Sequence, residues 1–278
     1  MRHAGVFIFA LLGASLAQAQ TVPAETAKPD SAKPLWELGA FGFGVSQQAY
    51  PGADQNIRRG LVLPFFLYRG AVLRADGETV GVRALKTPTV EVDVGFSGAF
   101  GSSSSSIDAR RGMPNLGTLV EFGPRVKWNI GPAYGGRLRA NFPLRGVFDL
   151  SDSFASRGLA FEPELVYERQ WGGWQVGTSA GAVFGNRKLA DTFYGVAPAF
   201  ATATRPAYDA QAGLIALRVG ASASRALSPD WRFFSFARLD STAGAANDDS
   251  PLVRRKTGAT VGAGLSYTWL RSEQKAAD

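Results

Sequence analysis

Apolar and polar residues alternate along most of this chain. In the range 90–97, valine and phenylalanine take the even positions, while Glu91, Asp93, Gly95 and Ser97 lie between them. The same two-residue period recurs over 120–130, 138–145, 159–168 and 261–269. Such alternation is typical of β-strands with one apolar and one polar face, so the pattern predicts an all-β protein.

The alternation divides into about twelve predicted strands, with about ten as the alternative count. The predicted strands are 35–46, 59–69, 71–75, 78–86, 88–100, 116–130, 134–148, 158–170, 174–185, 207–225, 230–241 and 256–270. Many of them reach the length of about ten residues that a tilted strand needs to cross a bilayer. Strands of soluble proteins are usually shorter, at about 5–6 residues.

The connections between these strands alternate between short and long. Tight turns are predicted at 69–70, 87, 131–133, 172–173 and 228–230, and long loops at 47–58, 101–115, 149–157, 186–206 and 242–255. Only the hairpin at Asp76-Gly77 is short on the long-loop side. Soluble sandwiches also alternate, but short periplasmic turns opposite long external loops are typical of outer-membrane barrels. We therefore predict a single transmembrane antiparallel up-and-down β-barrel in a bacterial outer membrane.

The tryptophans support this topology. All six fall at periplasmic strand ends or in periplasmic turns of the predicted barrel: Trp36, Trp128, Trp171, Trp174, Trp231 and Trp269. Indole prefers the membrane–water interface, where its ring and its N–H are both satisfied. The pattern favours a periplasmic aromatic rim, although tryptophan can also mark the core ends of a soluble β-protein.

The ends of the chain are predicted to lie outside the barrel. Residues 1–19 form a signal peptide, since Arg2 precedes an apolar run that ends in the small-x-small site Ala17-Gln18-Ala19. Residues 20–34 are a disordered periplasmic leader, 35–270 are the barrel, and 271–278 are a polar tail without periodicity.

Composition argues against catalysis. The chain has no cysteine and a single histidine, His3, inside the predicted signal peptide. The mature chain therefore has neither a serine–histidine triad nor a zinc or copper site, and we predict no enzyme, cofactor or metal. A carboxylate-only glycosidase site stays open in principle. The pI of about 9.9 suggests binding to nucleic acid. However, the basic residues are dispersed along the chain and no nucleic-acid-binding motif accompanies them.

Charged residues of both signs occupy the polar face of the strands. They form a predicted lumen network of Glu91, Asp93, Glu121, Arg125, Lys127, Arg137, Arg139, Arg145, Glu162, Glu164 and Glu168, with Arg218 and Arg238. Charges in a narrow lumen need partners because desolvation is costly. We expect pairs across the lumen that fill it; a conducting pore lined by the same residues is the alternative.

Basic clusters lie in four of the long loops. Their members are Arg58, Arg59, Arg110, Arg111, Arg187, Lys188, Arg254, Arg255 and Lys256. Guanidinium groups bind phosphate bidentately, which predicts contacts with lipopolysaccharide. Ordinary solvated loop charge is the alternative, because acidic residues such as Asp108 and Asp248 lie nearby.

Seven short segments stand out along the chain: Tyr50-Pro51-Gly52, Glu121–Val126, Leu144–Phe148, Phe161–Leu165, Asp191–Val196, Leu239-Asp240 and Asp249–Val253. They resemble elements of the MipA/OmpV outer-membrane family, the MltA-interacting protein family. Their order and spacing cover about residues 35–270. One departure is that Trp269 is followed by Leu270 and a polar tail, whereas such barrels usually end on an aromatic residue.

This resemblance implies a scaffold role for the chain. The namesake of the family binds a lytic transglycosylase and a bifunctional murein synthase, and other members are described as porin-like proteins or adhesins. The resemblance carries over no catalytic residue. It implies a scaffold for peptidoglycan synthesis and hydrolysis, with a small passive channel or a surface adhesin as alternatives. The sequence leaves open the identity of the partner, its docking residues and the oligomeric state.

Overall fold

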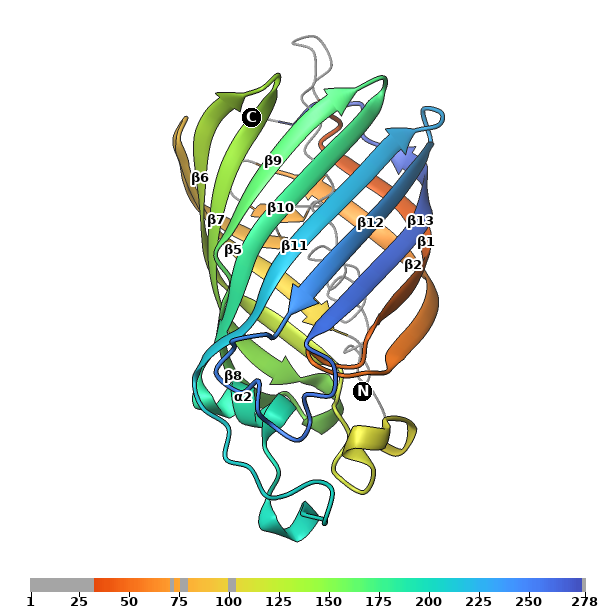
Figure 1. Cartoon of the computed structure of the whole chain (residues 1–278). Helices are drawn as coiled ribbons and strands as arrows, with labels where there is room; N and C mark the ends of the chain where they lie inside the picture. Colours follow the sequence, from red (N-terminus) through yellow and green to blue (C-terminus); the bar gives the residue numbers. More distant parts are fainter. Residues whose placement is uncertain (1–32, 71–72, 76–79, 100–103, 277–278) are drawn as a thin grey trace, which may run out of the picture.

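The computed structural model is a closed β-barrel with folded loops at one end (Figure 1). It describes residues 33–70, 73–75, 80–99 and 104–276. The predicted signal peptide and nearly all of the predicted leader lie outside this range. Among the described residues, no helix has the length and apolarity needed to span a membrane.

The described strands are antiparallel and follow one another around the wall. They are β1 (Trp36–Gln48), β2 (Asn56–Arg69), β3 (Leu73–Ala75), β4 (Val80–Lys86), β5 (Val90–Ala99), β6 (Leu119–Ala133), β7 (Gly136–Asp149), β8 (Ala155–Phe161), β9 (Glu164–Trp171), β10 (Trp174–Gly185), β11 (Gly213–Ala226), β12 (Trp231–Ser241) and β13 (Thr257–Arg271). The first strand pairs with the last, from Glu37↔Arg271 to Ser46↔Val261, and this pairing closes the barrel.

The prediction of about twelve strands is confirmed. β8 and β9 are two halves of one wall position, because both lie between β7 and β10. The predicted strand 158–170 is split between them at Glu162-Pro163. Proline has no N–H to donate to the ladder, which accounts for an interruption at this point.

The two faces of each strand differ as the alternation predicts. On β6, Val126 is 37% exposed and Trp128 49%, whereas Lys127 between them is 4% exposed. Leu265 on β13 is 41% exposed. These exposed apolar residues form the outer, lipid-facing surface, and the buried polar residues face the lumen.

Tight turns connect the strands at the periplasmic end, which is drawn at the top of Figure 1. Tyr134-Gly135 and Gly172-Gly173 each have two consecutive residues with positive φ, the geometry of a type I′ hairpin turn. The chain ends extend the closing ladder, since Leu35 N–H donates to the Gln274 carbonyl at 2.8 Å. The predicted tail and the end of the predicted leader are therefore ordered against each other.

The external loops hold most of the remaining structure. The loop predicted at 186–206 runs on to residue 212 and contains α2 (Arg187–Tyr194), which the alternation does not predict. Asn186 caps this helix, because its side-chain oxygen accepts a hydrogen bond from Leu189 N–H at 3.1 Å. Short 3-10 turns occupy 104–106, 108–110, 150–152 and 198–200.

The assignment of faces predicts where a charge disrupts the barrel. Val126→Arg and Leu265→Arg place a charge in the lipid-facing surface, and each should cost about 2–4 kcal/mol near the bilayer midplane. Urea unfolding in lipid vesicles, read from heat-modifiable gel mobility, measures this loss. Val126→Leu and Leu265→Met are the matched controls and should keep the midpoint of the parent protein. Arginine variants that unfold with the parent would contradict the assignment.

Candidate functional site

The lumen contains a belt of paired charges that follows the wall from β5 to β12. At one end, Asp93 has a fully buried side chain. Its Oδ1 accepts from Arg125 Nε at 3.0 Å and its Oδ2 from Arg125 Nη2 at 2.8 Å. Lys127 Nζ lies 2.9 Å from Asp93 and 3.2 Å from Glu91. Both carboxylates are therefore bound by cations of the adjacent strand β6.

Arg145 occupies the centre of the belt and its side chain is fully buried. Its Nη1 lies 3.6 Å from Glu121 and 3.5 Å from Glu162. Glu162 also lies 3.4 Å from Arg218 of β11, and this contact crosses the position of β10. This part of the lumen is therefore a continuous ionic network. Glu162 lies between the guanidinium groups of Arg145 and Arg218, and Arg145 lies between the carboxylates of Glu121 and Glu162.

The far end of the belt belongs to β11 and β12. Arg218 Nε lies 2.7 Å from Asp240, and Arg238 Nε lies 3.0 Å from the other oxygen of the same carboxylate. Nearer the periplasm, Arg139 lies 3.1 Å from Glu168, and Asn141 donates to Glu164 at 2.8 Å.

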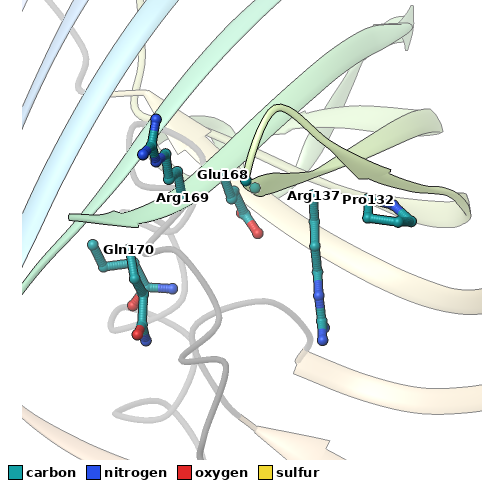
Figure 2. A pocket seen from close by; sticks show the side chains of 8 residues that line it. Pro132, Arg137, Glu168, Arg169 and Gln170 are labelled. Atoms are coloured by element: carbon teal, nitrogen blue, oxygen red, sulfur yellow. The ribbon is translucent and has the colours of Figure 1, made fainter.

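Most of these pairs join neighbouring strands, which corrects the expectation of pairs across the lumen. Directly opposed inward side chains of adjacent strands lie within about 5 Å of each other, so a cation reaches the next strand before the opposite wall. Arg137 also differs from the expectation. It is exposed, and it lines a pocket of about 260 Å³ beside Glu168 and Pro132 (Figure 2).

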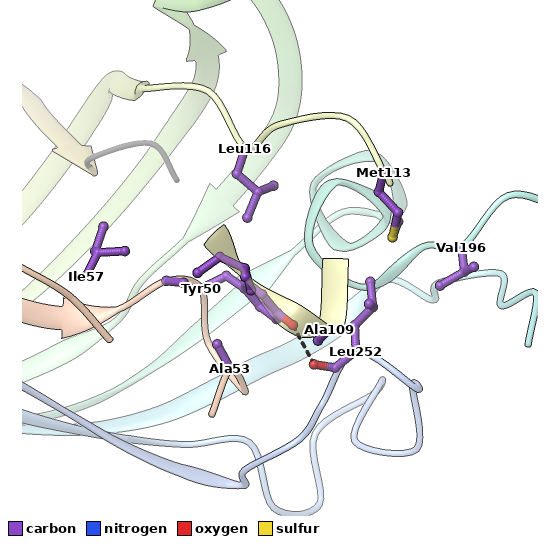
Figure 3. Close-up of a cluster of buried hydrophobic side chains, with 10 residues drawn as sticks. Tyr50, Ala53, Ile57, Ala109, Met113, Leu116, Val196 and Leu252 are labelled. Atoms are coloured by element: carbon purple, nitrogen blue, oxygen red, sulfur yellow. Dashed lines mark hydrogen bonds between the residues drawn. The ribbon is translucent and has the colours of Figure 1, made fainter. Parts of the chain in front are cut away.

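The external loops fold over the mouth as a cap with its own apolar core (Figure 3). The core of the cap consists of Ala49, Tyr50, Ala53, Ile57, Ile107, Ala109, Met113, Leu116, Val196 and Leu252. The Tyr50 hydroxyl donates to the Leu252 carbonyl at 2.7 Å. Burial raises the pKa of Tyr50 to about 12, so this hydroxyl keeps its proton at neutral pH.

Two buried arginines tie the loops of the cap together. Arg110 is 5% exposed and donates to the Phe193 carbonyl at 3.1 Å, and burial lowers its pKa. Arg205 is 7% exposed and donates to the carbonyls of Ala109 and Arg111, both at 3.0 Å. The predicted lipopolysaccharide contact is therefore wrong for Arg110, because its guanidinium faces the inside of the cap.

The other predicted basic residues lie on the surface. Arg58, Arg59, Arg111, Arg187, Lys188, Arg254, Arg255 and Lys256 are all exposed. Two of them have acidic partners: Arg111 pairs with Asp108, and Lys256 lies 2.8 Å from Asp248. That hydrogen bond from Lys256 lowers the pKa of Asp248.

Three of the family-like segments meet in the cap. Ser250 Oγ donates to the Tyr194 carbonyl at 2.8 Å, which joins the segments 249–253 and 191–196. The Gly52 carbonyl accepts from Arg254 N–H at 2.8 Å, which joins the first loop to the last. The remaining segments supply belt residues such as Glu121, Arg145 and Asp240. The sequence does not reveal that loops so far apart converge, because it contains no signal for contacts between loops.

All six tryptophans lie at the periplasmic ends of the strands or beside the turns there. Exposed fractions reach 70% at Trp171, 52% at Trp269 and 44% at Trp231. Trp174 packs edge-on against Phe233, with ring centroids 5.9 Å apart. Tyr134, at the tip of its turn, is 94% exposed. We call these tryptophans and Tyr134 the aromatic rim.

The described charged residues of the lumen form an ionic network. Within the described ranges, no group of three or more His, Cys, Asp or Glu side chains is placed to hold a metal ion. The buried carboxylates Asp93 and Asp240 are each bound by two basic side chains. The arrangement can fill a lumen and fix the shape of its wall.

Breaking the centre of the belt should be costly. Arg145→Met leaves Glu121 buried without its cation, and loss of one partner of a buried ion pair costs about 3–5 kcal/mol. The urea midpoint in lipid vesicles measures this loss. The double variant Arg145→Met/Glu121→Gln removes both charges and should recover most of the stability, since Glu162 keeps Arg218. A double variant as unstable as the single one would show that the ion pair is not the cause.

The cap should open without unfolding the barrel. Arg205→Met removes hydrogen bonds from a charged donor to buried carbonyls, each worth about 1.5–3 kcal/mol. Amide hydrogen exchange over 107–113 should therefore accelerate about tenfold or more. The urea midpoint of the barrel should not move. Arg254→Met, at an exposed cap residue, is the control and should leave exchange unchanged. If amide exchange over 107–113 were the same in Arg205→Met and Arg254→Met, Arg205 would not be what holds these loops together.

The chain was compared with solved structures, and several outer-membrane barrels match. Outer membrane phospholipase A from Escherichia coli is 10% identical, with a TM-score of 0.37, and the match covers 83% of this chain and 92% of that one. The COG4313 outer membrane channel from Pseudomonas putida F1 is 10% identical, with a TM-score of 0.36. That match covers 87% of this chain and 100% of the channel. At these values the likeness carries no argument about function.

Sequence comparison identifies the family. No curated protein sequence matches the chain. The model of the family described as MltA-interacting protein MipA matches residues 38–269. This match runs from β1 into the last residues of β13 and includes the belt, the cap and nearly all of the rim. The chain therefore belongs to the MltA-interacting protein MipA family, and it is a bacterial outer-membrane β-barrel.

Proposed function

We propose that this barrel is a non-catalytic scaffold whose periplasmic rim binds a lytic transglycosylase. On this proposal the barrel also brings a murein synthase to the same place, so that peptidoglycan hydrolysis and synthesis are coupled at the outer membrane. The observation that carries the proposal is the family match over residues 38–269, since the description of that family names an interaction with MltA.

The charge pairing in the lumen supports a role in binding over one in transport. The charges of the belt are paired along the inner wall from β5 to β12. A paired charge attracts a permeating ion less strongly than an unpaired charge does. The cap adds an apolar core over the external mouth. An open anion channel would instead need an accessible constriction lined by cations.

The aromatic rim supports the choice of the periplasmic face. Exposed tyrosine and tryptophan anchor many protein interfaces, because they bury a large area at a low entropic cost. Tyr134 and Trp171 adjoin two type I′ turns, which hold their backbones rigidly. The pocket beside Arg137, shown in Figure 2, lies between the same two hairpins and offers a recess for a partner side chain. Tryptophans on the lipid-facing side also anchor the barrel at the interface.

We further propose that the exposed basic residues of the external end contact lipopolysaccharide. Arg254 and Arg255 are exposed beside the cap, and Arg58 and Arg59 are exposed at the outer end of β2. Phosphate groups bind guanidinium bidentately. These contacts would hold the loops at the membrane surface and have no part in binding the periplasmic partner.

Exchange of the periplasmic turns tests the scaffold role. Variants that replace 134–135, 172–173 and 227–230 with Gly-Ser linkers, together with Trp171→Ser, remove the proposed anchors. The barrel should still assemble, as read from heat-modifiable mobility. Capture of a purified lytic transglycosylase of the MltA type in detergent should fall by about a hundredfold, the effect of losing two interface anchors.

The control replaces Arg254 and Arg255 with serine in the external cap and should leave capture unchanged. Planar-bilayer recording of the unaltered protein supplies the second readout, and little steady conductance is expected. Stable anion-selective openings together with no capture would make the protein a channel. If the turn-exchange variant still captured the transglycosylase, the binding surface would lie outside the aromatic rim.

A further inference from the structure

An arginine lies on the lipid-facing surface near the periplasmic edge of the barrel. Leu265 of β13 faces lipid, and it stands directly opposite Phe233 in the β12–β13 register. Phe233 in turn stands opposite Arg225 in the β11–β12 register. Directly opposed residues of an antiparallel pair point to the same side of the sheet. Arg225 therefore faces lipid, one residue before the end of β11.

Two aromatic side chains of the neighbouring strands accompany Arg225. Its guanidinium carbon lies 5.6 Å from the centroid of the Trp174 ring, which is the distance of a cation–π contact. Trp174 packs on Phe233, so the three side chains form one group, which we call the arginine–aromatic cluster. The contact with the ring engages the charge of Arg225 but none of its N–H donors.

No carboxylate neutralises Arg225 within the part of the chain that the structure describes. Other arginines of the periplasmic end do have an acidic partner, since Arg139 lies 3.1 Å from Glu168 and Arg271 pairs with Asp230. Arg225 is also exposed. It therefore presents a positive charge and its hydrogen-bond donors to the molecules that surround the barrel.

The surrounding surface carries charge of the same sign. At the outward positions of β9 to β12, the described chain has two basic residues, Arg169 and Arg225, and no aspartate or glutamate. Figure 2 shows the Arg169 side chain on the opposite side of β9 from Glu168 and Gln170. This face therefore attracts anions from the lipid layer next to it.

The cluster lies at the depth of the lipid headgroups. β9 to β12 form the front of the wall in Figure 1, and their periplasmic ends lie at the top. Arg225 comes just before the periplasmic turn 227–230, and Trp231 after that turn packs on Tyr267 with ring centroids 4.8 Å apart. Tryptophan and tyrosine mark the boundary between hydrocarbon and headgroups, so Arg225 reaches the phosphate groups of the periplasmic leaflet.

Small side chains lie on the membrane side of Arg225. The next outward residues of β11 are Ala223 and Ala221, which stand opposite Ser235 and Ala237 of β12. These side chains project little from the wall, so an acyl chain can pack against it while its headgroup lies at Arg225. They supply packing only, and the selection of a ligand rests on the charge above them.

We propose that the arginine–aromatic cluster binds an anionic phospholipid of the periplasmic leaflet. Arg225 donates hydrogen bonds to the phosphate, and the rings of Trp174 and Phe233 pack against the glycerol and the upper acyl carbons. The site is on the outside of the wall and does not depend on the scaffold role. An acidic segment of a partner protein is the competing occupant, and the experiment distinguishes the two.

Fluorescence quenching by brominated lipids tests the proposal on the full mature barrel. The parent protein for this test has Trp174 as its only tryptophan, with phenylalanine at the other five positions. Vesicles of phosphatidylcholine contain increasing amounts of brominated phosphatidylglycerol or brominated phosphatidylcholine. Phosphatidylglycerol should bind beside Trp174 about fivefold more strongly, the effect of one cation close to a membrane surface. Salt at about 1 M should weaken this preference by screening.

Two variants separate the site from the overall charge. Arg225→Gln removes the cation and keeps most of the side chain, so quenching by the two lipids should become equal. Lys86→Gln is the matched control, because it removes an exposed positive charge from a residue opposite the lumen-facing Glu91 at the same end of the barrel. It should keep the preference of the parent. Neither variant should change the capture of the transglycosylase.

Native mass spectrometry of the barrel with all six tryptophans supplies a second measurement. After release from micelles that contain equal amounts of the two lipids, the unaltered protein should retain phosphatidylglycerol in excess, whereas Arg225→Gln should not. Heat-modifiable mobility checks that each variant has assembled.

Three results would overturn the proposal. Equal quenching and equal retention of the two lipids in the unaltered site would mean that it does not select an anionic lipid. A preference lost equally in Arg225→Gln and Lys86→Gln would assign it to the net charge of the barrel. Loss of transglycosylase capture in Arg225→Gln, with the lipid preference unchanged, would place Arg225 in a protein interface instead.

Discussion

The structure depends on the need to pair every backbone N–H and C=O that faces hydrocarbon. The ladder between β1 and β13 meets this need where the ends of the sheet join, and Leu35 and Gln274 extend it past the strands. Closure of this kind is what allows a chain with a mean hydropathy of −0.04 to cross a membrane on strands.

The same sheet geometry determines how the lumen is filled. Asp93 stands directly opposite Arg125 in the β5–β6 register, and Arg218 stands opposite Asp240 in the β11–β12 register. Opposed residues of adjacent strands are the closest inward neighbours, so ion pairs form along the wall. A further pair joins β1 and β2 near the periplasm, where Arg69 Nη1 lies 2.7 Å from Glu37 Oε1.

Alternation in the sequence was enough to predict the strands and their faces, because a period of two residues reports directly on a half-buried strand. The turn predicted at 131–133 was misplaced, since these residues belong to β6 and the chain turns at Tyr134-Gly135. Alternation predicted charges at Asp93 and Arg145 on the inner face but not their partners, which depend on register. It missed α2, although Asn186 is a good N-cap, because one short helix gives too few turns of periodicity. The burial of Arg110 also escaped prediction, since only the convergence of distant loops creates its site.

The cap is attached to the barrel wall through β1 and β2. Ile57, at the outer end of β2, packs in the core of the cap, and Gln48 Nε2, at the end of β1, donates to the Ala53 carbonyl at 2.7 Å. Gly52 accepts from Arg254 and Arg255 and so attaches the same loop to the last one. The cap thus joins the outer end of β2 to the loop before β13, so packing in the cap also stabilises the outer end of the wall.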